Sequence, residues 1–340
     1  MKILVTGGAG FIGSNFVRRT LQDAYPGLEG AEVVVYDALT YSGNLANLEP
    51  VAASPRYAFV HGDIRDSELL DRTLPGVDAI VHFAAESHVD RSVLDAGPFV
   101  ETNVLGTQRL LDAALRAGVP RFLHVSTDEV YGSIAEGSWD ESRPLEPNSP
   151  YSASKAGSDL LARSYHRTHG MNLSITRCSN NYGPYHFPEK VIPLFVTNAI
   201  DGIPVPLYGD GLNERDWLHV TDHCRALDLL LEAGEPGQVY NVGGGNHVRN
   251  IDLTREILRL VGRDESLIRP VADRPGHDRR YSLDSGKLAA LGWAPRVSFE
   301  AGLRETAGWY RANEWWWRPI KEQDPAFKAY YQRQYGVRQD

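Results

Sequence analysis

The sequence has little cysteine and no long apolar run. Cys178 and Cys224 are its only cysteines, and they do not form a Cys-x-x-Cys motif, so neither a disulfide framework nor a cysteine-rich metal site is expected. No stretch approaches the roughly 20 apolar residues of a membrane helix, and no apolar signal segment opens the chain. These features predict a protein of the reducing cytoplasm that does not bind or cross a membrane.

Basic residues are also fewer than acidic residues. The chain has 35 Lys and Arg against 44 Asp and Glu, which gives a net charge of −9. Binding to a phosphate backbone requires a basic face, so nucleic acid is not an expected partner, whereas a single nucleotide needs only a few local donors. The histidines show no ligand spacing such as H-E-x-x-H, so we expect no metal. Packing roles are expected for His82, His88 and His186.

The first half of the chain alternates short apolar runs with amphipathic segments. Runs rich in Val, Ile and Phe predict buried strands at Lys2–Thr6, Glu32–Tyr36, Ala58–His61, Ala79–Phe83 and Arg121–Ser126. Helices are expected at Ile12–Asp23, Ser67–Leu74, Pro98–Ala117 and Ser152–His169. Such alternation predicts an α/β fold with a doubly wound parallel Rossmann sheet, whose ligands bind at the carboxyl ends of the strands.

The pattern changes after about Cys178, where Gly and Pro become frequent. We therefore expect a Rossmann domain over residues 1–178, with 215–240 returning to it, and a smaller interleaved substrate-binding domain over 179–340. The run Glu314-Trp315-Trp316-Trp317-Arg318 is expected to pack in a core or an interface.

A glycine-rich segment, Gly7-Gly8-Ala9-Gly10-Phe11-Ile12-Gly13, joins the first strand to the first helix. Glycine lets the backbone turn tightly and approach a pyrophosphate, to which the helix N-terminus offers N–H groups. The spacing G-x-x-G-x-x-G differs from the standard G-x-G-x-x-G fingerprint. Asp37 ends the second strand, where a carboxylate meets the adenosine ribose and repels a 2′-phosphate, so NAD is favoured over NADP.

Residues after the next two strands extend this expected binding line. Asp63-Ile64 follows the third strand, and Phe83-Ala84-Ala85-Glu86-Ser87 follows the fourth. The small alanines would let a cofactor pass close to the backbone. Alternatives stay open, since Asp37 also suits a strand-end turn and the two alanines also suit tight helix–sheet packing.

Tyr151 and Lys155 stand four residues apart on an expected helix that Pro150 precedes. This spacing places both side chains on one helical face. A phenol titrates near ~10 and is a poor base at neutral pH. We expect the Lys155 ammonium and a positive nicotinamide ring to favour the phenolate.

These motifs resemble the extended short-chain dehydrogenase/reductase family and, within it, the dTDP-glucose 4,6-dehydratases. The resemblance spans nearly the whole chain and rests, beside Thr6–Gly13, Tyr151 and Lys155, on the segments Leu39–Leu45, Ser126–Gly132, Arg177–Pro184 and Asp273–Asp278. It implies NAD-dependent oxidation of C4 of a nucleotide-bound glucose, elimination of water across C5–C6, and reduction at C6. The implied product is a 4-keto-6-deoxy sugar, and the implied class is lyase.

The triplet Thr127-Asp128-Glu129 is the most specific part of this resemblance. Elimination from a 4-keto sugar needs a base for the C5 proton and an acid for the departing C6 hydroxyl, and two carboxyls can divide these tasks. The resemblance assigns the base to Glu129, the acid to Asp128, and the C4 hydroxyl to Tyr151 and Thr127, with Lys155 on the cofactor ribose. An acidic surface turn is the alternative interpretation of the two carboxyls.

The resemblance also implies two sets of binding residues. Expected cofactor contacts are Gly7, Gly10, Phe11, Ile12, Gly13, Asp37, Leu39, Thr40, Ser42, Gly43, Asp63, Ile64, Phe83, Ala84, Ala85, Ser87, Thr102, Ser126, Tyr151, Lys155, Cys178 and Asn181. Expected substrate contacts are Ser87, Thr127, Glu129, Tyr151, Asn180, Lys190, Val191, Pro206, Tyr208, Arg215, Asn250, Arg274, His277 and Tyr281. Arg215 also suits an ion pair with Asp210 or Glu214, and His277 also suits a loop cap.

Other functions remain as alternatives. A GDP-mannose 4,6-dehydratase resembles an NADP user, which Asp37 disfavours, and an epimerase or decarboxylase is disfavoured by Asp128-Glu129. A non-catalytic dinucleotide sensor would usually lose Tyr151 or Lys155. In the resembling family the helices expected at Pro98–Ala117 and Ser152–His169 pair between subunits, which implies a homodimer.

Overall fold

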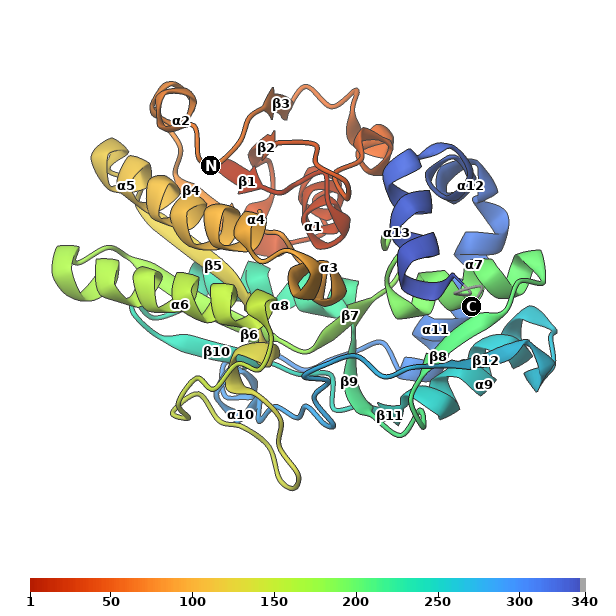
Figure 1. The fold of residues 1–340 in the computed structure, drawn as a ribbon. Coiled ribbons are helices and arrows are strands. Elements are labelled where there is room, and N and C mark those ends of the chain that lie inside the picture. The colour runs from red at the N-terminus through yellow and green to blue at the C-terminus, as the bar shows by residue number, and fades with distance from the viewer. Residues whose placement is uncertain (337–340) are drawn as a thin grey trace.

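The computed structural model describes residues 1–336, and a seven-stranded sheet forms its centre (Figure 1). All neighbouring strands in it are parallel, in the order β10-β6-β5-β4-β1-β2-β3. Their bounds are β1 Lys2–Thr6, β2 Glu32–Asp37, β3 Tyr57–His61, β4 Ala79–His82, β5 Arg121–Thr127, β6 Leu173–Cys178 and β10 Val239–Val242. The predicted doubly wound parallel sheet is confirmed, and each expected strand agrees to within one residue at either end.

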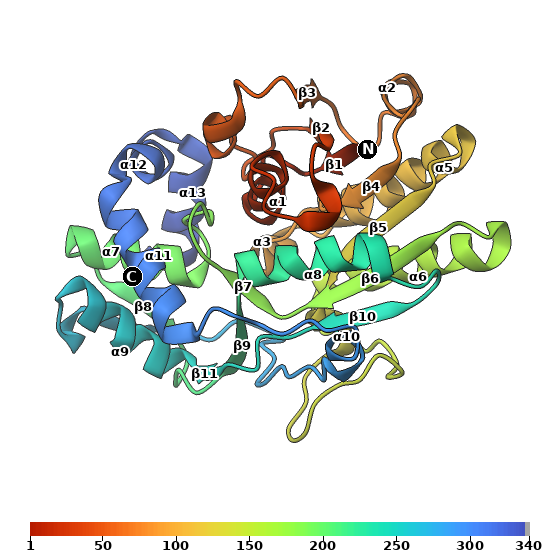
Figure 2. The same ribbon diagram turned by 180° about the vertical axis from the view of Figure 1, so that it is seen from behind.

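Helices cover both faces of this sheet (Figures 1 and 2). Helices α1 (Phe11–Leu21) and α8 (Val220–Ala233) lie on one face, and α5 (Thr107–Ala117) and α6 (Pro150–His169) lie on the other. Side chains of β1 point alternately into the two cores: Ile3 and Val5 pack with α1 and α8, and Leu4 packs with α5 and α6. Burial on both faces explains why these strands are continuous apolar runs.

The helix expected at Pro98–Ala117 is not uniform. It starts as α4 (Gly97–Phe99), widens into π-helical turns over Val100–Gly106 and continues as α5. Within the wide turns, the Asn103 amide accepts from the backbone N–H of Glu86 and donates to Ser154 Oγ of α6. Wide turns of this kind often mark functional sites, and here they lie beside the cavity described below.

The second half forms a smaller α/β unit with its own core. Its sheets are β11-β9-β7, with β7 Asn180–Tyr182, β9 Glu214–His219 and β11 His247–Arg249, and β12-β8, with β8 Val205–Tyr208 and β12 Ile268–Val271. Its helices are α7 Val191–Asp201, α9 Asn250–Val261, α11 Phe299–Ala312, α12 Glu314–Gln323 and α13 Pro325–Tyr335. The tryptophan run contributes Trp316 and Trp317 to this core, while Trp315 is exposed.

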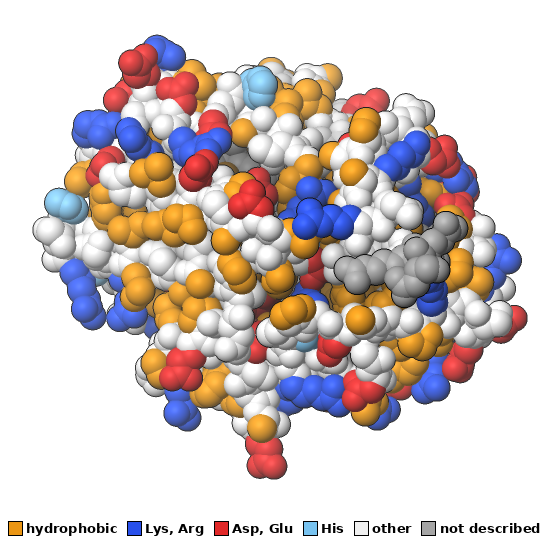
Figure 3. All heavy atoms as spheres, in the orientation of Figure 1, with side chains coloured by type: hydrophobic (Ala, Val, Ile, Leu, Met, Phe, Trp, Pro, Cys, Tyr) orange, Lys and Arg blue, Asp and Glu red, His pale blue; other side chains and the backbone are white. Residues whose placement is uncertain are grey.

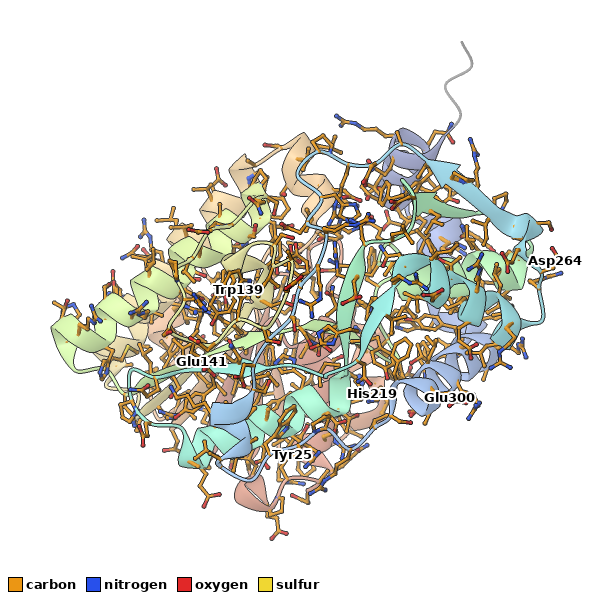
Figure 4. All side chains as sticks on the ribbon, turned by 90° about the horizontal axis from the view of Figure 1, so that it is seen from below. Tyr25, Trp139, Glu141, His219, Asp264 and Glu300 are labelled. Atoms are coloured by element: carbon orange, nitrogen blue, oxygen red, sulfur yellow. The ribbon has the colours of Figure 1, made fainter. Side chains whose placement is uncertain are left out.

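The chain crosses back to the large sheet with α8, later than expected, and again with α10 (Gly286–Ala289), which packs against β10. β9 belongs to the small sheet, so the predicted return over residues 215–240 begins only with α8 and ends with β10 beside β6. Near β10, the segment between β5 and α6 folds against the same edge: Glu141 accepts from the Asn241 backbone N–H, and Trp139 lies beside it (Figure 4).

The remaining helical segments are short. They are α2 Ser67–Thr73, α3 Val89–Leu94, α10 Gly286–Ala289, and the turns Pro26–Leu28, Leu45–Asn47, Glu49–Val51, Asp128–Tyr131 and Glu265–Leu267. Among residues 1–336, no helix combines the length and the apolar character that spanning a bilayer requires.

Candidate active site

A cavity of about 380 Å³ opens at the carboxyl ends of β1, β2, β4 and β5 and extends to the second half. It brings together every expected cofactor residue except Leu39. It also contains the expected catalytic residues Thr127, Asp128, Glu129, Tyr151 and Lys155, and the expected substrate residues Ser87, Asn180, Lys190 and Val191. A crevice at the switch between β1 and β4 is where doubly wound sheets bind ligands.

The glycine segment lies in this cavity with no room for side chains. Gly7 has a φ of +67°, and a Cβ there would lie 2.6 Å from the backbone N of Ala84. A Cβ on Gly13 would lie 2.4 Å from the carbonyl oxygen of Gly7. Helix α1 begins after Gly10 without a side-chain cap, so its first N–H groups face the cavity unprotected. This cradle suits a pyrophosphate.

Asp37 ends β2 beside the glycine segment. Its carboxylate accepts from the Ala9 N–H at 2.8 Å and from the Leu39 N–H at 2.8 Å. The second bond forms the alternative strand-end turn, and the first ties the carboxylate to the cradle, where the expected ribose contact stays a prediction. Leu39, at a φ of +51°, contributes its backbone to this turn and is not among the residues that line the cavity, so its cofactor contact stays a prediction. The site fits a dinucleotide with an unmodified ribose.

Helix α6 positions the tyrosine and the lysine. Ser149 caps its N-terminus by accepting from the Ser152 N–H, and Pro150 occupies the first turn. Tyr151 and Lys155 are both buried on the inward side of this helix. Lys155 Nζ donates to the Val125 carbonyl at 2.8 Å, and burial lowers the pKa of Lys155 to about 8.

Tyr151 is buried beside an acidic side chain. Burial, followed by the nearby Glu129, raises the pKa of Tyr151 well above its ordinary value, while a hydrogen bond with Thr127 acts in the opposite direction. That Lys155 and a positive nicotinamide ring together favour the phenolate stays a prediction, since Lys155 Nζ uses only one of its donors on the Val125 carbonyl. Without a bound cofactor, the surroundings of Tyr151 favour its protonated form.

The Thr127-Asp128-Glu129 triplet lies where β5 passes into a single helical turn. Thr127 Oγ1 donates to Asp128 Oδ1 at 3.2 Å and accepts from the Glu129 N–H at 3.3 Å. Asp128 is only 2% exposed, and its Oδ2 has no partner among the described residues. Burial, then Glu129 and Asp216, raises the pKa of Asp128 well above the usual carboxyl range. Asp128 is therefore buried and does not belong to an exposed acidic turn.

Glu129 is the second carboxyl of the pair, and basic side chains surround it. Burial raises its pKa, while the charges of Arg274, Lys190 and Arg215 act to lower it. Two neighbouring carboxyls in different surroundings are suited to separate acid and base roles. Lys190 Nζ also donates to the Ser87 carbonyl at 2.6 Å, which holds this cation at the cavity wall.

Arg215 is oriented by the backbone and not by an acidic partner. It donates to the carbonyls of Glu214 and Asp278, and its guanidinium lies 4.5 Å from the ring centre of Tyr281. The alternative ion pairs are wrong, because Asp210 pairs with Arg279 and Glu214 with Arg280. Arg215 therefore keeps its charge available to an anion beside Glu129.

The other expected substrate residues lie farther from the cavity. Tyr208 and His277 pack edge to face at 6.0 Å, and His277 accepts or donates a hydrogen bond with Asp273 of its own loop. Tyr281 is buried and donates to Asp278. Pro206 lines a separate depression next to α13, and Asn250 begins α9, so the structure does not bring these two into the cavity.

Sequence reasoning missed several residues of the cavity wall. They include Tyr36, Tyr41, Arg65, Ser179, Phe187 and Trp217. Tyr41 lies inside the segment Leu39–Leu45 that carried the resemblance, so the signal was present there. His186 also lines the cavity and stacks on Phe11 at 4.2 Å, whereas His82 is buried between Thr6 and Thr107. Among residues 1–336, no group of three His, Cys, Asp or Glu is arranged to hold a metal.

Comparison with known proteins places this geometry in a family. The family described as GDP-mannose 4,6 dehydratase matches residues 4–306. The dTDP-glucose 4,6-dehydratase of Streptomyces niveus is 58% identical over 327 residues, which cover 96% of this chain and 97% of that protein. A crystal structure of dTDP-glucose 4,6-dehydratase from Streptomyces venezuelae, with NAD and dTDP bound, is 63% identical with a TM-score of 0.94, covering 94% and 100% of the two chains.

Epimerases are more distant. The UDP-glucose 4-epimerase of Thermus thermophilus, solved with NAD, is 34% identical with a TM-score of 0.84, covering 92% of this chain and 100% of that one. The fold and site thus define a nucleotide-sugar-modifying enzyme of the short-chain dehydrogenase/reductase class. Within that class, the chain belongs to the family of dTDP-glucose 4,6-dehydratases.

Proposed function

We propose that this chain is an NAD-dependent dTDP-glucose 4,6-dehydratase, a lyase that forms dTDP-4-keto-6-deoxy-glucose. The observation that carries the proposal is one cavity that holds Tyr151 and Lys155 together with Asp128 and Glu129. The first pair suits oxidation at C4, and the second pair supplies the acid and the base that dehydration needs. Relatives that are 58–60% identical carry the same name.

NAD, held by the glycine cradle and Asp37, supplies the redox chemistry when bound, since it is reduced at the C4 oxidation and reoxidised at the C6 reduction. Tyr151, whose phenolate the positive charges of Lys155 and of a bound nicotinamide ring would favour, receives the C4 hydroxyl proton, and Thr127 orients that hydroxyl. Glu129 removes the C5 proton, which the 4-keto group makes acidic, and returns a proton to C5 when C6 accepts the hydride. Asp128, protonated because burial raises its pKa, gives its proton to the departing C6 oxygen, so that water leaves. Lys155 holds the cofactor ribose.

We assign the remaining expected contacts to the same reaction. Lys190, Arg215 and Arg274 place positive charge near Glu129, which suits the substrate diphosphate. Residues 1–178 with α8 and β10 hold the cofactor, and the rest of the chain mainly holds the sugar nucleotide. The two cysteines are buried and unpaired, which accords with a cytoplasmic protein.

One assay tests the proposal. Purified protein is incubated with dTDP-glucose without added NAD, and the 4-keto-6-deoxy product is followed. We expect product, because the cofactor is regenerated in each turnover and is retained. Absence of product, even with NAD supplied, would refute the assignment. UDP-glucose and GDP-mannose in parallel incubations report the preference for the base and the sugar.

A homodimer is part of this proposal. Large apolar side chains are exposed on three neighbouring helical segments: α3, the continuous helix from α4 to α5, and α6. These side chains are Val93, Leu94, Val100, Leu105, Leu115 and Leu160. Apolar side chains gather over α5 and α6 in Figure 3. An apolar surface of this kind favours association with a second copy.

A further inference from the structure

Asp90, on α3, is a buried carboxylate outside the cavity wall that no step of the reaction uses. It is 5% exposed. Its Oδ1 accepts from Arg274 Nη1 at 2.9 Å, and its Oδ2 accepts from the hydroxyls of Tyr208 at 3.0 Å and Tyr330 at 3.2 Å. A carboxylate with three donors is costly to bury unless those contacts are maintained, so the arrangement is specific.

The three donors come from different parts of the fold. Tyr208 ends β8, Arg274 lies in the loop after β12, and Tyr330 belongs to α13, while α3 itself packs on α6 of the cofactor-binding half. The Tyr208 hydroxyl also accepts from Gln334 Nε2 at 2.6 Å. Asp90 thus joins the cofactor-binding half to the segments that we assign to the nucleotide.

Arg274 keeps binding capacity in this arrangement. Its Nε is buried and has no partner among the described residues, although Nη1 is held by Asp90. Its charge is also the foremost influence opposing the raised pKa of Glu129. The Arg274 guanidinium is therefore held by Asp90 through Nη1, while Nε can still donate to an anion beside Glu129.

We propose that Asp90 is a positioning residue for the sugar nucleotide, which fixes Tyr208 and Arg274 in the orientation that binds the nucleoside diphosphate. This proposal rests on the proposed function. Asp90 acts through its two partners and stays outside the reacting atoms. Its loss should weaken binding of the nucleotide and leave the chemical step largely intact.

The α13 helix supports the same carboxylate from the far side. The Tyr330 ring also lies against Arg91, whose guanidinium is 4.8 Å from that ring centre and 4.2 Å from the ring centre of Tyr41. Tyr330→Phe removes only the hydroxyl that donates to Asp90 and keeps this stacking. It is therefore a mild variant of the same perturbation.

The test measures the Kd of dTDP by calorimetry and the kcat and KM for dTDP-glucose in NAD-loaded protein. For Asp90→Asn we expect Kd and KM to rise roughly ten-fold or more, with kcat changed by less than about three-fold, as loss of a charge-assisted network implies. Tyr330→Phe should raise Kd by roughly two- to five-fold. Asp95→Asn, an exposed carboxyl at the end of α3, is the matched control and should change neither constant.

An unchanged Kd for dTDP in Asp90→Asn overturns the proposal, as does a fall in kcat at unchanged KM. If Asp90→Asn does not fold, Tyr330→Phe decides, since an unchanged Kd in that folded variant is equally contrary. The dTDP titration does not require turnover. A wild-type protein that binds dTDP without dehydrating dTDP-glucose would refute the proposed function and leave the role of Asp90 standing.

Discussion

Thr127 Oγ1 donates a hydrogen bond to Asp128 Oδ1 across 3.2 Å, although the two residues are adjacent in the chain. The same hydroxyl accepts from the N–H of Glu129, so one threonine fixes both carboxyl-bearing residues. Thr127→Val keeps the shape and removes these bonds. We expect kcat to fall by roughly 10- to 100-fold and unfolding free energy by about 1 kcal/mol, since the cap of the turn is lost.

The matched control for this variant is Thr127→Ser, which keeps the hydroxyl. It should retain most of the kcat of the wild type. Steady-state kinetics with dTDP-glucose and thermal denaturation measure both effects. Full activity in Thr127→Val together with a loss in Thr127→Ser would show that the methyl group, and not the hydroxyl, is what the site requires.

Glu129→Gln separates the steps of the reaction. The amide cannot accept the C5 proton, so oxidation at C4 should proceed and elimination should stall. Absorbance of the reduced cofactor should then accumulate when dTDP-glucose is mixed with NAD-loaded protein. Tyr151→Phe is the contrasting variant, in which that absorbance should not develop. Normal turnover by Glu129→Gln would disprove the assignment of the base.

Asp128 makes the unfolding free energy of the protein depend on pH. Because burial raises its pKa, the folded state binds more protons than the unfolded state above the ordinary carboxyl range, and unfolding free energy falls as pH rises through that window. Asp128→Asn removes this loss. At pH 8 we expect it to raise unfolding free energy by about 1 to 3 kcal/mol and to abolish most dehydration.

Denaturant titrations at several pH values check this prediction. The gain should shrink as pH falls and vanish below the ordinary aspartate pKa of ~3.9, where Asp128 is protonated in both states. If the increase in unfolding free energy does not depend on pH, its cause is better packing of the asparagine and not a raised pKa of Asp128.

Gly7→Ala should impair retention of the cofactor. Its Cβ would meet the backbone N of Ala84 at 2.6 Å, so β1 and the segment after β4 must move apart. We expect the NAD content of the purified protein to fall by about ten-fold or more, because the cradle loses its geometry. Cofactor released by acid and measured per chain is the readout.

Gly118→Ala is the control for backbone strain. Gly118 also has a positive φ, of +64°, but an added Cβ would meet nothing within 4 Å. It should cost about 1 kcal/mol of stability and leave the NAD content unchanged. Parallel losses of NAD in both variants would indicate general destabilisation.

Leu160→Lys should disrupt the proposed dimer. The Leu160 side chain is 54% exposed on α6, and a charge there would have to be buried between two copies. Light scattering should give twice the chain mass of 37.7 kDa for the wild type and a single chain mass for the variant. Leu212→Lys, at 41% exposure on another surface, should stay a dimer.

The fold was largely predictable from sequence because the strands of the large sheet are buried on both faces. The run from Glu32 to Tyr36, for example, needs only its own apolar character to be recognised as a strand. The strands β7 and β11 have only three residues each and are stabilised by pairing with β9. Their local sequence therefore carries no pattern that predicts a strand. The π-helical turns at Val100–Gly106 likewise have no sequence pattern that distinguishes them from an ordinary α-helix.

The site was predictable from sequence at positions where a residue type or a spacing is characteristic of a single function. Glycine at position 7 and the Tyr151–Lys155 spacing led directly to the cavity. Asp90 was not found, since a single acidic residue at the start of a short helix is typical of a solvated cap, and its three donors come from residues 118 to 240 positions away. The raised pKa of Tyr151 likewise depends on burial that only the three-dimensional structure defines.

The position of β10 beside β6 has a consequence for synthesis of the protein. Val239 pairs with Ile175, so β6 remains an open edge until the ribosome has released α8 and β10, long after the other six strands are complete. An open, apolar edge invites pairing with other chains. Nascent chains stalled before Val239 should therefore aggregate or engage chaperones, whereas those released past Val242 can close the sheet.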